Sequence, residues 1–231
     1  MLKIIAEIGI NHNGNFDYIY ELIRQASIGG ADLIKFQLYT SKLVFGDNSR
    51  KHNEFTFKQV EKIQGICNFY NVEFFASVFD EEKLEWCEQL DVKRYKIASR
   101  TWENNKEFVE QVLSKGKPTY VSLGMANIQH TLSYGDIKFF NCISKYPTTF
   151  EDLTKEKFIF DDFVIGWSDH FYGISACLYA IAKGAKMVEK HFTLDKPMGP
   201  HRDHIGSMDL KELKMLNTHG RELWRTQNAI I

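Results

Sequence analysis

The sequence has 231 residues, of which 44% are hydrophobic and 26% are charged. These proportions are close to the average of globular proteins and exclude a disordered or fibrous chain. The 29 Lys and Arg residues and the 30 Asp and Glu residues leave a net charge of −1, so the chain lacks the overall positive field that binding to nucleic acid or to an anionic membrane would require.

Eight short apolar segments recur along the chain, each rich in β-branched and aromatic residues. Because they are almost continuously apolar rather than alternating, they are typical of parallel strands that are covered on both faces. The predicted strands are Lys3–Ile10, Asp32–Leu38, Glu73–Phe79, Arg94–Ser99, Pro118–Gly124, Ile137–Ser144, Phe163–Asp169 and Ala185–Thr193.

Amphipathic segments between these strands predict helices. They are Tyr18–Ser27, Phe55–Tyr70, Glu81–Leu90, Glu107–Ser114, Ile174–Lys183 and Leu210–Arg225. Four polar residues stand near helix starts, where a side-chain oxygen can cap free backbone amides: Asp17, Thr56, Asp80 and Ser175.

The alternation of strands and helices predicts an α/β protein with a parallel sheet. Dividing 231 residues among eight units leaves about 29 residues for each, which is close to the minimum for a strand, a helix and two loops. We therefore predict a (β/α)₈ TIM barrel that forms a single domain over residues 1–231. An open, doubly wound sheet is the alternative, although no GxGxxG motif follows the first strand.

In such a barrel the active site lies at the carboxyl ends of the strands. The predicted strands do end in reactive polar residues, as an enzyme requires. They carry or precede Glu7, Lys35, Gln37, Ser77, Lys96, Ser99, Ser122, Ser144, Tyr146, Ser168, His170, Glu189 and His191.

Charged residues within apolar strands are costly unless they are paired or bind a ligand. Alternation places Lys35 and Gln37 on one face of their strand, and Glu189 and His191 on one face of theirs. The lysines could instead extend between helices or form ion pairs inside the barrel. Two lysines among several hydroxyl groups favour a pocket for phosphate or carboxylate.

His170 and His191 follow or end adjacent strands of the predicted barrel and are expected to face each other. Two neutral imidazoles with open coordination positions suit Mn, Zn or Fe. A hydrogen-bonded pair or a general acid–base couple is the alternative.

The four cysteines are widely separated and form no CxxC pair, which argues against zinc-ribbon and thioredoxin-like sites. The sequence also has neither a secretory signal nor an uncharged apolar run of about 18 residues. We therefore expect a cytoplasmic protein that binds neither nucleic acid nor a membrane.

Eight motifs occur in order: IIAEIGINHNG, ADLIKFQ, YKIAS, SLGM, SKYPT, IGWSDH, GAKMVEKHFTLD and GPHRDH. Together they resemble the catalytic barrel of the sialic acid synthase (N-acetylneuraminate synthase) family, whose members also make other nonulosonic acids. The resemblance spans about residues 3–216. It implies the condensation of phosphoenolpyruvate with N-acetylmannosamine or a related N-acetylated hexose, with release of phosphate.

The resemblance also implies roles for individual residues. A divalent metal, usually Mn²⁺ with Mg²⁺ or Co²⁺ as alternatives, would be held by His170 and His191, and Glu7 and Glu189 would be catalytic. Residues matching the phosphoenolpyruvate site are Lys35, Ser77, Lys96, Ser99, Ser122, Ser144 and Ser168. Those matching the sugar contacts are Gln37, Tyr146 and Asp203.

The sequence departs from the family pattern at several positions. Leu123 stands where threonine is common, Ser144 stands where many members have asparagine, and Arg100 follows the YKIAS motif in place of a small residue. We therefore expect a non-standard acceptor sugar. Typical members continue into an antifreeze-like domain that contributes an arginine across a homodimer. Here only the barrel is expected, with Arg100 or Arg202 as a substitute for that arginine.

Two other functions remain open. One is a related phosphoenolpyruvate-condensing or aldolase barrel that acts on a phosphorylated sugar, with Arg100 and Arg202 as phosphate ligands. The other is a degenerate barrel that binds a sugar or a protein without turnover. The joint presence of the lysines, glutamates and histidines at the strand ends argues against the second.

Overall fold

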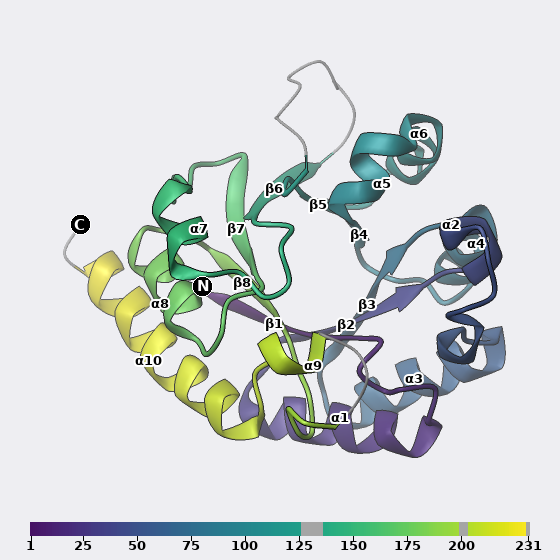
Figure 1. Ribbon diagram of the computed structural model, residues 1–231, viewed down its shortest axis with the longest axis horizontal. Helices are drawn as coiled ribbons and strands as arrows, with labels where there is room; N and C mark the ends of the chain where they lie inside the picture. Colours follow the sequence, from purple (N-terminus) through teal and green to yellow (C-terminus); the bar gives the residue numbers. More distant parts are fainter. Residues whose placement is uncertain (126–135, 199–202, 230–231) are drawn as a thin grey trace.

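The computed structural model describes residues 1–125, 136–198 and 203–229. Eight parallel strands close into a barrel in sequence order, and β8 pairs with β1 (Figure 1). The predicted (β/α)₈ fold is therefore confirmed, and the open sheet is wrong. The strands are β1 (Lys3–Gly9), β2 (Leu33–Leu38), β3 (Glu73–Val78), β4 (Tyr95–Ile97), β5 (Thr119–Ser122), β6 (Ile137–Cys142), β7 (Val164–Asp169) and β8 (Met187–His191).

The six predicted helices are present, and they surround the barrel (Figure 1). They are α1 (Phe16–Gly29), α3 (Phe57–Phe69), α4 (Glu81–Gln89), α6 (Lys106–Ser114), α8 (Ser175–Ala182) and α10 (Leu210–Ala229). The structure adds short elements that the sequence pattern did not predict: α2 (Ser41–Phe45), the 3₁₀ turn η1 (Lys51–Asn53), α5 (Ser99–Asn104), α7 (Phe150–Lys155) and α9 (Asp203–Gly206).

Two of the four predicted capping residues cap a helix. The Thr56 side chain accepts a hydrogen bond from Gln59 N in a reciprocal capping box, and the Asp80 side chain accepts one from Lys83 N. The other two predictions are wrong. Asn15 caps α1 in place of Asp17, and α8 begins after Ile174 without a side-chain cap.

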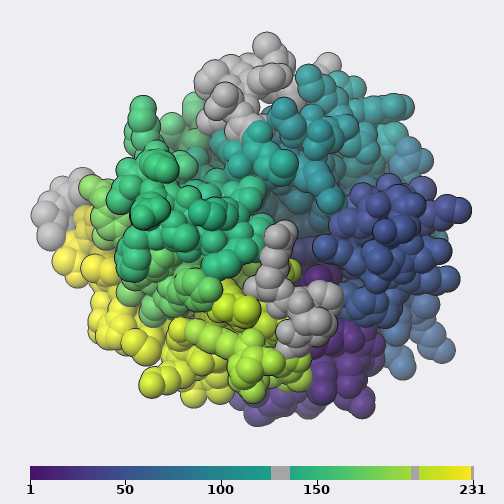
Figure 2. All heavy atoms as spheres, viewed as in Figure 1, coloured from purple at the N-terminus to yellow at the C-terminus, as the bar shows by residue number. Residues whose placement is uncertain are grey.

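The last helix packs against the first where the barrel closes. In Figure 2 the purple atoms of the N-terminal segment border yellow-green atoms of the C-terminal part of the chain. Arg221 on α10 donates hydrogen bonds to the Asp32 carboxylate at 2.9 Å and to the Leu2 carbonyl at 3.1 Å. This side chain therefore ties the last helix to the amino-terminal edge of the first two strands.

The barrel interior contains an apolar layer, which consists of Ile5, Leu33, Phe75, Tyr120, Phe140, Ile165 and Met187. The next inward position lies two residues further along a strand, because side chains alternate across a sheet. At that position β1 carries Glu7, β2 carries Lys35 and β8 carries Glu189. A polar layer therefore lies directly above the apolar one, at the carboxyl ends of the strands.

The described part of the chain contains no helix with the length and apolar character needed to cross a bilayer.

Candidate active site

A cavity of about 410 Å³ opens at the carboxyl ends of the strands. The fourteen residues assigned above to catalysis, metal binding or substrate contacts all line it, as do Arg100 and seven other described residues. The predicted ones are Glu7, Lys35, Gln37, Ser77, Lys96, Ser99, Ser122, Ser144, Tyr146, Ser168, His170, Glu189, His191 and Asp203. Their proximity is a geometric finding, and their individual roles stay predictions.

Strand register brings the charged residues of the site together. On β1, Glu7 is paired with Lys35 of β2 on one side and with His191 of β8 on the other. The register of β1 shifts after Glu7, where Gly9 adopts a φ of +55°. A Cβ atom at Gly9 would come within 3.1 Å of the Glu7 carboxylate and within 3.2 Å of the Gln37 amide and the His191 ring, so this glycine allows the three side chains to converge.

The floor of the cavity is an alternating chain of charges. Lys35 Nζ lies 3.0 Å from Glu7 Oε2 and 3.4 Å from Glu189 Oε1, and Lys96 Nζ lies 3.0 Å from Glu189 Oε2. All four side chains are buried. The alternative prediction, in which the lysines form ion pairs inside the barrel, is thus confirmed. The paired lysines nevertheless face the cavity, where they can also meet a ligand.

The charged residues of the floor shift one another's pKa values. Burial alone would raise the pKa of Glu189, but Lys35 and Lys96 outweigh it and lower that pKa to about 2. Burial opposes the charge of Lys35, yet Glu189 and Glu7 raise its pKa overall. Glu189 is therefore a permanent carboxylate at neutral pH, because proton uptake would have to remove two favourable ion pairs.

Hydroxyl groups surround the two ammonium groups. Lys35 Nζ donates to Ser77 Oγ at 2.8 Å, and Lys96 Nζ donates to Ser122 Oγ at 2.7 Å. Ser168 Oγ lies 3.2 Å from Lys96 Nζ and 3.0 Å from Ser122 Oγ. Rotatable hydroxyls beside buried cations form a pocket suited to the oxygens of a phosphate or carboxylate group.

The two predicted metal ligands face each other, with ring centroids 5.8 Å apart. His170 Nδ1 lies 2.7 Å from the Ile143 carbonyl oxygen, which can only accept, so Nδ1 carries the proton and Nε2 keeps its lone pair. Burial, with His191 as a second cause, lowers the pKa of His170 to about 4. His191 Nδ1 is buried and has no hydrogen-bond partner among the described residues.

These two imidazoles suit a divalent metal in their chemistry, since imidazole nitrogens are common ligands of such ions and the His170 ring is already oriented by a carbonyl group. In residues 1–125, 136–198 and 203–229, no group of three or more His, Cys, Asp or Glu side chains is arranged to hold a metal ion. Water or substrate oxygens would have to complete the coordination of any ion held by this pair.

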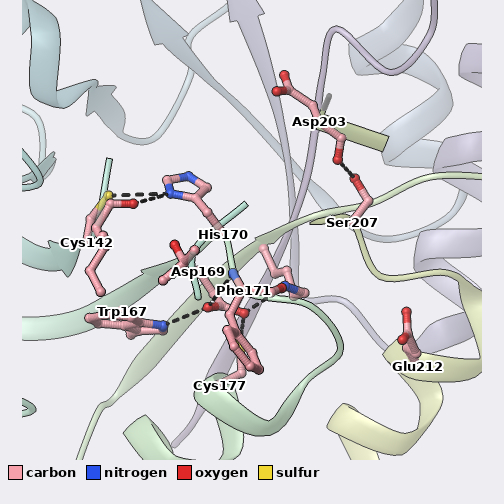
Figure 3. Close-up of polar contacts among 12 residues, drawn as sticks. Cys142, Trp167, Asp169, His170, Phe171, Cys177, Asp203, Ser207 and Glu212 are labelled. Atoms are coloured by element: carbon pink, nitrogen blue, oxygen red, sulfur yellow. Dashed lines mark hydrogen bonds and ion pairs between the residues drawn. The ribbon is translucent and has the colours of Figure 1, made fainter. Parts of the chain in front are cut away.

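Three further predicted residues, Tyr146, Asp203 and Ser144, also line the cavity. The Tyr146 ring packs against His170 with centroids 3.9 Å apart and the ring planes tilted by 39°. Asp203 begins α9, and its carbonyl accepts a hydrogen bond from Ser207 Oγ at 2.6 Å (Figure 3). Ser144 is exposed and follows β6. Arg202, proposed above as an anion ligand, lies outside the described residues.

A second buried network lies on the helix side of β7 and β8 (Figure 3). Lys190 Nζ donates to Asp169 Oδ2 at 2.7 Å and to the Phe171 carbonyl at 2.5 Å. Asp169 Oδ1 accepts from Trp167 Nε1 and from Phe171 N, each at 3.2 Å. The network fixes the backbone on both sides of His170, and so it holds that imidazole at the edge of the cavity.

The prediction missed several residues that line the cavity, including Phe45, Arg50, Phe79 and Met125. Phe45 ends α2 and Arg50 precedes η1, both within the loop between β2 and α3. Phe45 and Arg50 lie well beyond the end of the predicted second strand, so the strand pattern did not indicate that they line the cavity.

Comparisons with known proteins agree on one family. A sequence model of the NeuB family matches residues 22–230. The chain is 32% identical to an N,N'-diacetyllegionaminic acid synthase from Campylobacter jejuni, covering 95% of this chain and 75% of that protein. It is 34% identical to an N-acetylneuraminate-9-phosphate synthase from Mus musculus, covering 92% of this chain and 67% of that protein.

Solved structures are also similar to this chain. An N-acetylneuraminic acid synthetase from Leptospira borgpetersenii, in complex with citrate, superposes with a TM-score of 0.88 at 30% identity, covering 98% of this chain and 85% of that one. A truncated 3-deoxy-D-arabino-heptulosonate 7-phosphate synthase from Thermotoga maritima has a TM-score of 0.69 at 15% identity. It shares the barrel fold.

Proposed function

The chain belongs to the NeuB family, and on that premise we propose that it is a carbon–carbon bond-forming synthase. It condenses phosphoenolpyruvate with an N-acetylated aldose, such as N-acetylmannosamine or an analogue, to give a nonulosonic acid and phosphate. The observation that carries this proposal is the buried Glu7–Lys35–Glu189–Lys96 floor, which shares one cavity with a ring of hydroxyls and two imidazoles.

Phosphoenolpyruvate occupies the floor in this proposal. Its phosphate and carboxylate oxygens accept hydrogen bonds from Lys96 and Lys35 and from the surrounding serine hydroxyls. Both ammonium groups are almost fully buried, so water screens their attraction for the substrate only weakly. The preformed donors also stabilise the charge of the departing phosphate.

The reaction requires one new carbon–carbon bond and one water molecule. Carbon 3 of the enol attacks the aldehyde carbon of the sugar, whose oxygen becomes a hydroxyl group. Water adds to carbon 2, and phosphate leaves to give the 2-oxo acid. Glu189 is held as a carboxylate by two lysines, so it stabilises positive charge at carbon 2. Glu7 is then the group that orients the water and accepts its proton, and this proton balances the one that the sugar oxygen takes up as it becomes a hydroxyl group.

A divalent cation, with Mn²⁺ as the first candidate, would be held by His170 and His191. When bound there, it supplies Lewis acidity toward the aldehyde oxygen of the acceptor. The chain's own contribution is to orient the His170 ring through Nδ1, and to keep its Nε2 free for a ligand bond. Tyr146 stacks on that ring and limits its rotation.

The test combines purified protein, phosphoenolpyruvate, Mn²⁺ and a panel of N-acetylated hexoses, with phosphate and 2-oxo acid as the measured products. Turnover should fall at least about 100-fold in His170→Ala and His191→Ala, while His219→Ala, an exposed histidine on α10, should behave as wild type. Bound Mn²⁺, measured by paramagnetic resonance, should fall in the same two variants. The absence of product with every acceptor would instead favour a binding barrel without turnover.

A synthase that acts on a phosphorylated sugar is the second candidate function. It is favoured by Arg50 and Arg100, which line the cavity and form no ion pair within the described part of the chain. A single domain over residues 1–231, a homodimer and a cytoplasmic location stay predictions.

A further inference from the structure

Each imidazole of the cavity directly follows, in the chain, one member of a buried ion pair. Asp169 precedes His170, and Lys190 precedes His191. Lys190 Nζ lies 2.7 Å from Asp169 Oδ2, and both side chains are completely inaccessible to solvent. Asp169 and Lys190 are also the last two residues that β7 and β8 pair in register. The ion pair therefore joins the two strands directly beside both histidines.

Both members of the ion pair also hold the backbone on the far side of His170. Asp169 Oδ1 accepts a hydrogen bond from Phe171 N at 3.2 Å and another from Trp167 Nε1 at 3.2 Å (Figure 3). Lys190 Nζ donates to the Phe171 carbonyl at 2.5 Å. A displacement of the His170 backbone would therefore have to break several of these bonds at once.

The two imidazole rings depend on the ion pair to different degrees. His170 Nδ1 lies 2.7 Å from the Ile143 carbonyl oxygen, so this ring has a hydrogen-bonding partner of its own. His191 Nδ1 is buried and has no such partner among the described residues. The His191 carbonyl, in contrast, accepts from Met208 N at 2.8 Å. The place of the His191 ring is thus set through its backbone, which the neighbouring Lys190 ties to β7.

We propose that the Asp169–Lys190 ion pair positions His170 and His191 relative to each other, and thereby sets the affinity of the two imidazoles for a divalent cation. This inference rests on the proposed function, because it takes the imidazole pair as the cation site. The ring centroids are 5.8 Å apart, and the ion pair maintains this spacing from the helix side of the two strands. Groups behind the ligands of a metal commonly orient those ligands in this way.

A contribution to stability alone would not require charges at these two positions. Charges without solvent access lose their hydration, so a well-packed apolar pair of similar volume is often as stable as a buried ion pair, or more stable. An apolar pair makes no directed bond between the strands, however. It can restore the stability of the barrel without restoring the spacing of the histidines. Stability and cation affinity should therefore respond differently to the same substitution.

The test measures Mn²⁺ binding to the purified protein without substrates, by paramagnetic resonance of the free ion. Asp169→Leu/Lys190→Met should raise the Kd for Mn²⁺ about 10- to 100-fold, the usual effect of removing groups that orient metal ligands. Asp162→Leu/Lys186→Met is the matched control. That ion pair joins the amino ends of the same two strands at 2.9 Å but is exposed, so its removal should leave the Kd within about twofold. Binding should be lost in His170→Ala, which identifies the imidazole pair as the measured site.

An unchanged Kd in Asp169→Leu/Lys190→Met, with a cooperative thermal transition that shows the variant to be folded, would overturn the proposal. If the double variant does not fold, Asp169→Asn well below its melting temperature takes its place. This substitution keeps the shape of the side chain and removes its charge, so the Kd should again rise, and an unchanged value would refute the inference.

Failure of this inference can be told apart from failure of the proposed function, because no substrate is present in the binding measurement. A protein that binds Mn²⁺ as expected but forms no product would refute the synthase reaction and leave the inference standing. Equal binding by the wild type and His170→Ala, or no binding by either, would overturn the inference together with the cation site. Product formation by the same protein would then still support the synthase reaction.

Discussion

The buried Asp169–Lys190 pair offers a sharp test of how this barrel is stabilised. Both side chains are completely inaccessible to solvent. Asp169→Asn would remove the negative charge and leave the ammonium group with neutral oxygen acceptors, such as the Phe171 carbonyl, in place of its counter-charge. A buried charge that has lost its counter-charge is poorly solvated, so the variant should be much less stable than the wild type.

The expected loss of stability is about 3–5 kcal/mol, which is the usual cost of breaking a buried ion pair from one side. For a chain of this length each kcal/mol lowers the melting temperature by roughly 2–4 °C, so Asp169→Asn should melt about 6–20 °C lower. The Lys186–Asp162 pair is the matched control. Its N–O distance is 2.9 Å, but its side chains are 46% and 91% exposed. Asp162→Asn should cost at most about 1 kcal/mol.

Calorimetry or circular dichroism during heating gives both melting temperatures under the same conditions. The double variant Asp169→Leu/Lys190→Met should recover much of the lost stability, because no buried charge is left unpaired. If Asp169→Asn melts no lower than Asp162→Asn, then burial does not determine the cost and the reasoning is refuted.

Three further outcomes are expected. Gly166→Ala would place a Cβ atom 2.6 Å from the Phe140 ring inside the barrel, and should cost about 1–3 kcal/mol in urea unfolding; an unchanged midpoint would contradict this. Arg221→Ala would remove the hydrogen bond to Asp32, and should cost about 1–3 kcal/mol in the same assay, whereas no loss would show that α10 is held by packing alone. Burial raises the pKa of the Cys142 thiol to about 11, so iodoacetamide at pH 8 should leave it unmodified until the protein is denatured; labelling of the native protein would show that the thiol is accessible.

The fold could be predicted because each strand is a continuous apolar run, and each of the longer helices has an apolar face. The ends of β4 could not be predicted in the same way. The sequence around Arg94–Ser99 is uniformly compatible with a strand, yet Ser99 begins α5 and the strand covers three residues. Short helices such as α2 and α9 are set by tertiary contacts and have too few residues to show a period.

The candidate site could be predicted to the extent that its residues come from strand ends. Two features depend on contacts that the strand pattern does not show, one between neighbouring strands and one within a loop. One is the partner of Lys190, which alternation places on the face opposite Glu189 without indicating Asp169. The other is Arg50, which reaches the cavity because its loop folds back against Phe45.

Along the strands, the residues that fill the barrel core are different from those that line the cavity. Ile5 and Met187 belong to the layer that fills the closed barrel, whereas Glu7 and Glu189, two residues further on, face the cavity. Loops such as the one that carries Arg50 lie further out still. Such a barrel can exchange its outer residues, and with them its choice of substrate, while the inner layer preserves the scaffold. Acceptor preference can therefore change without compensating changes in the core.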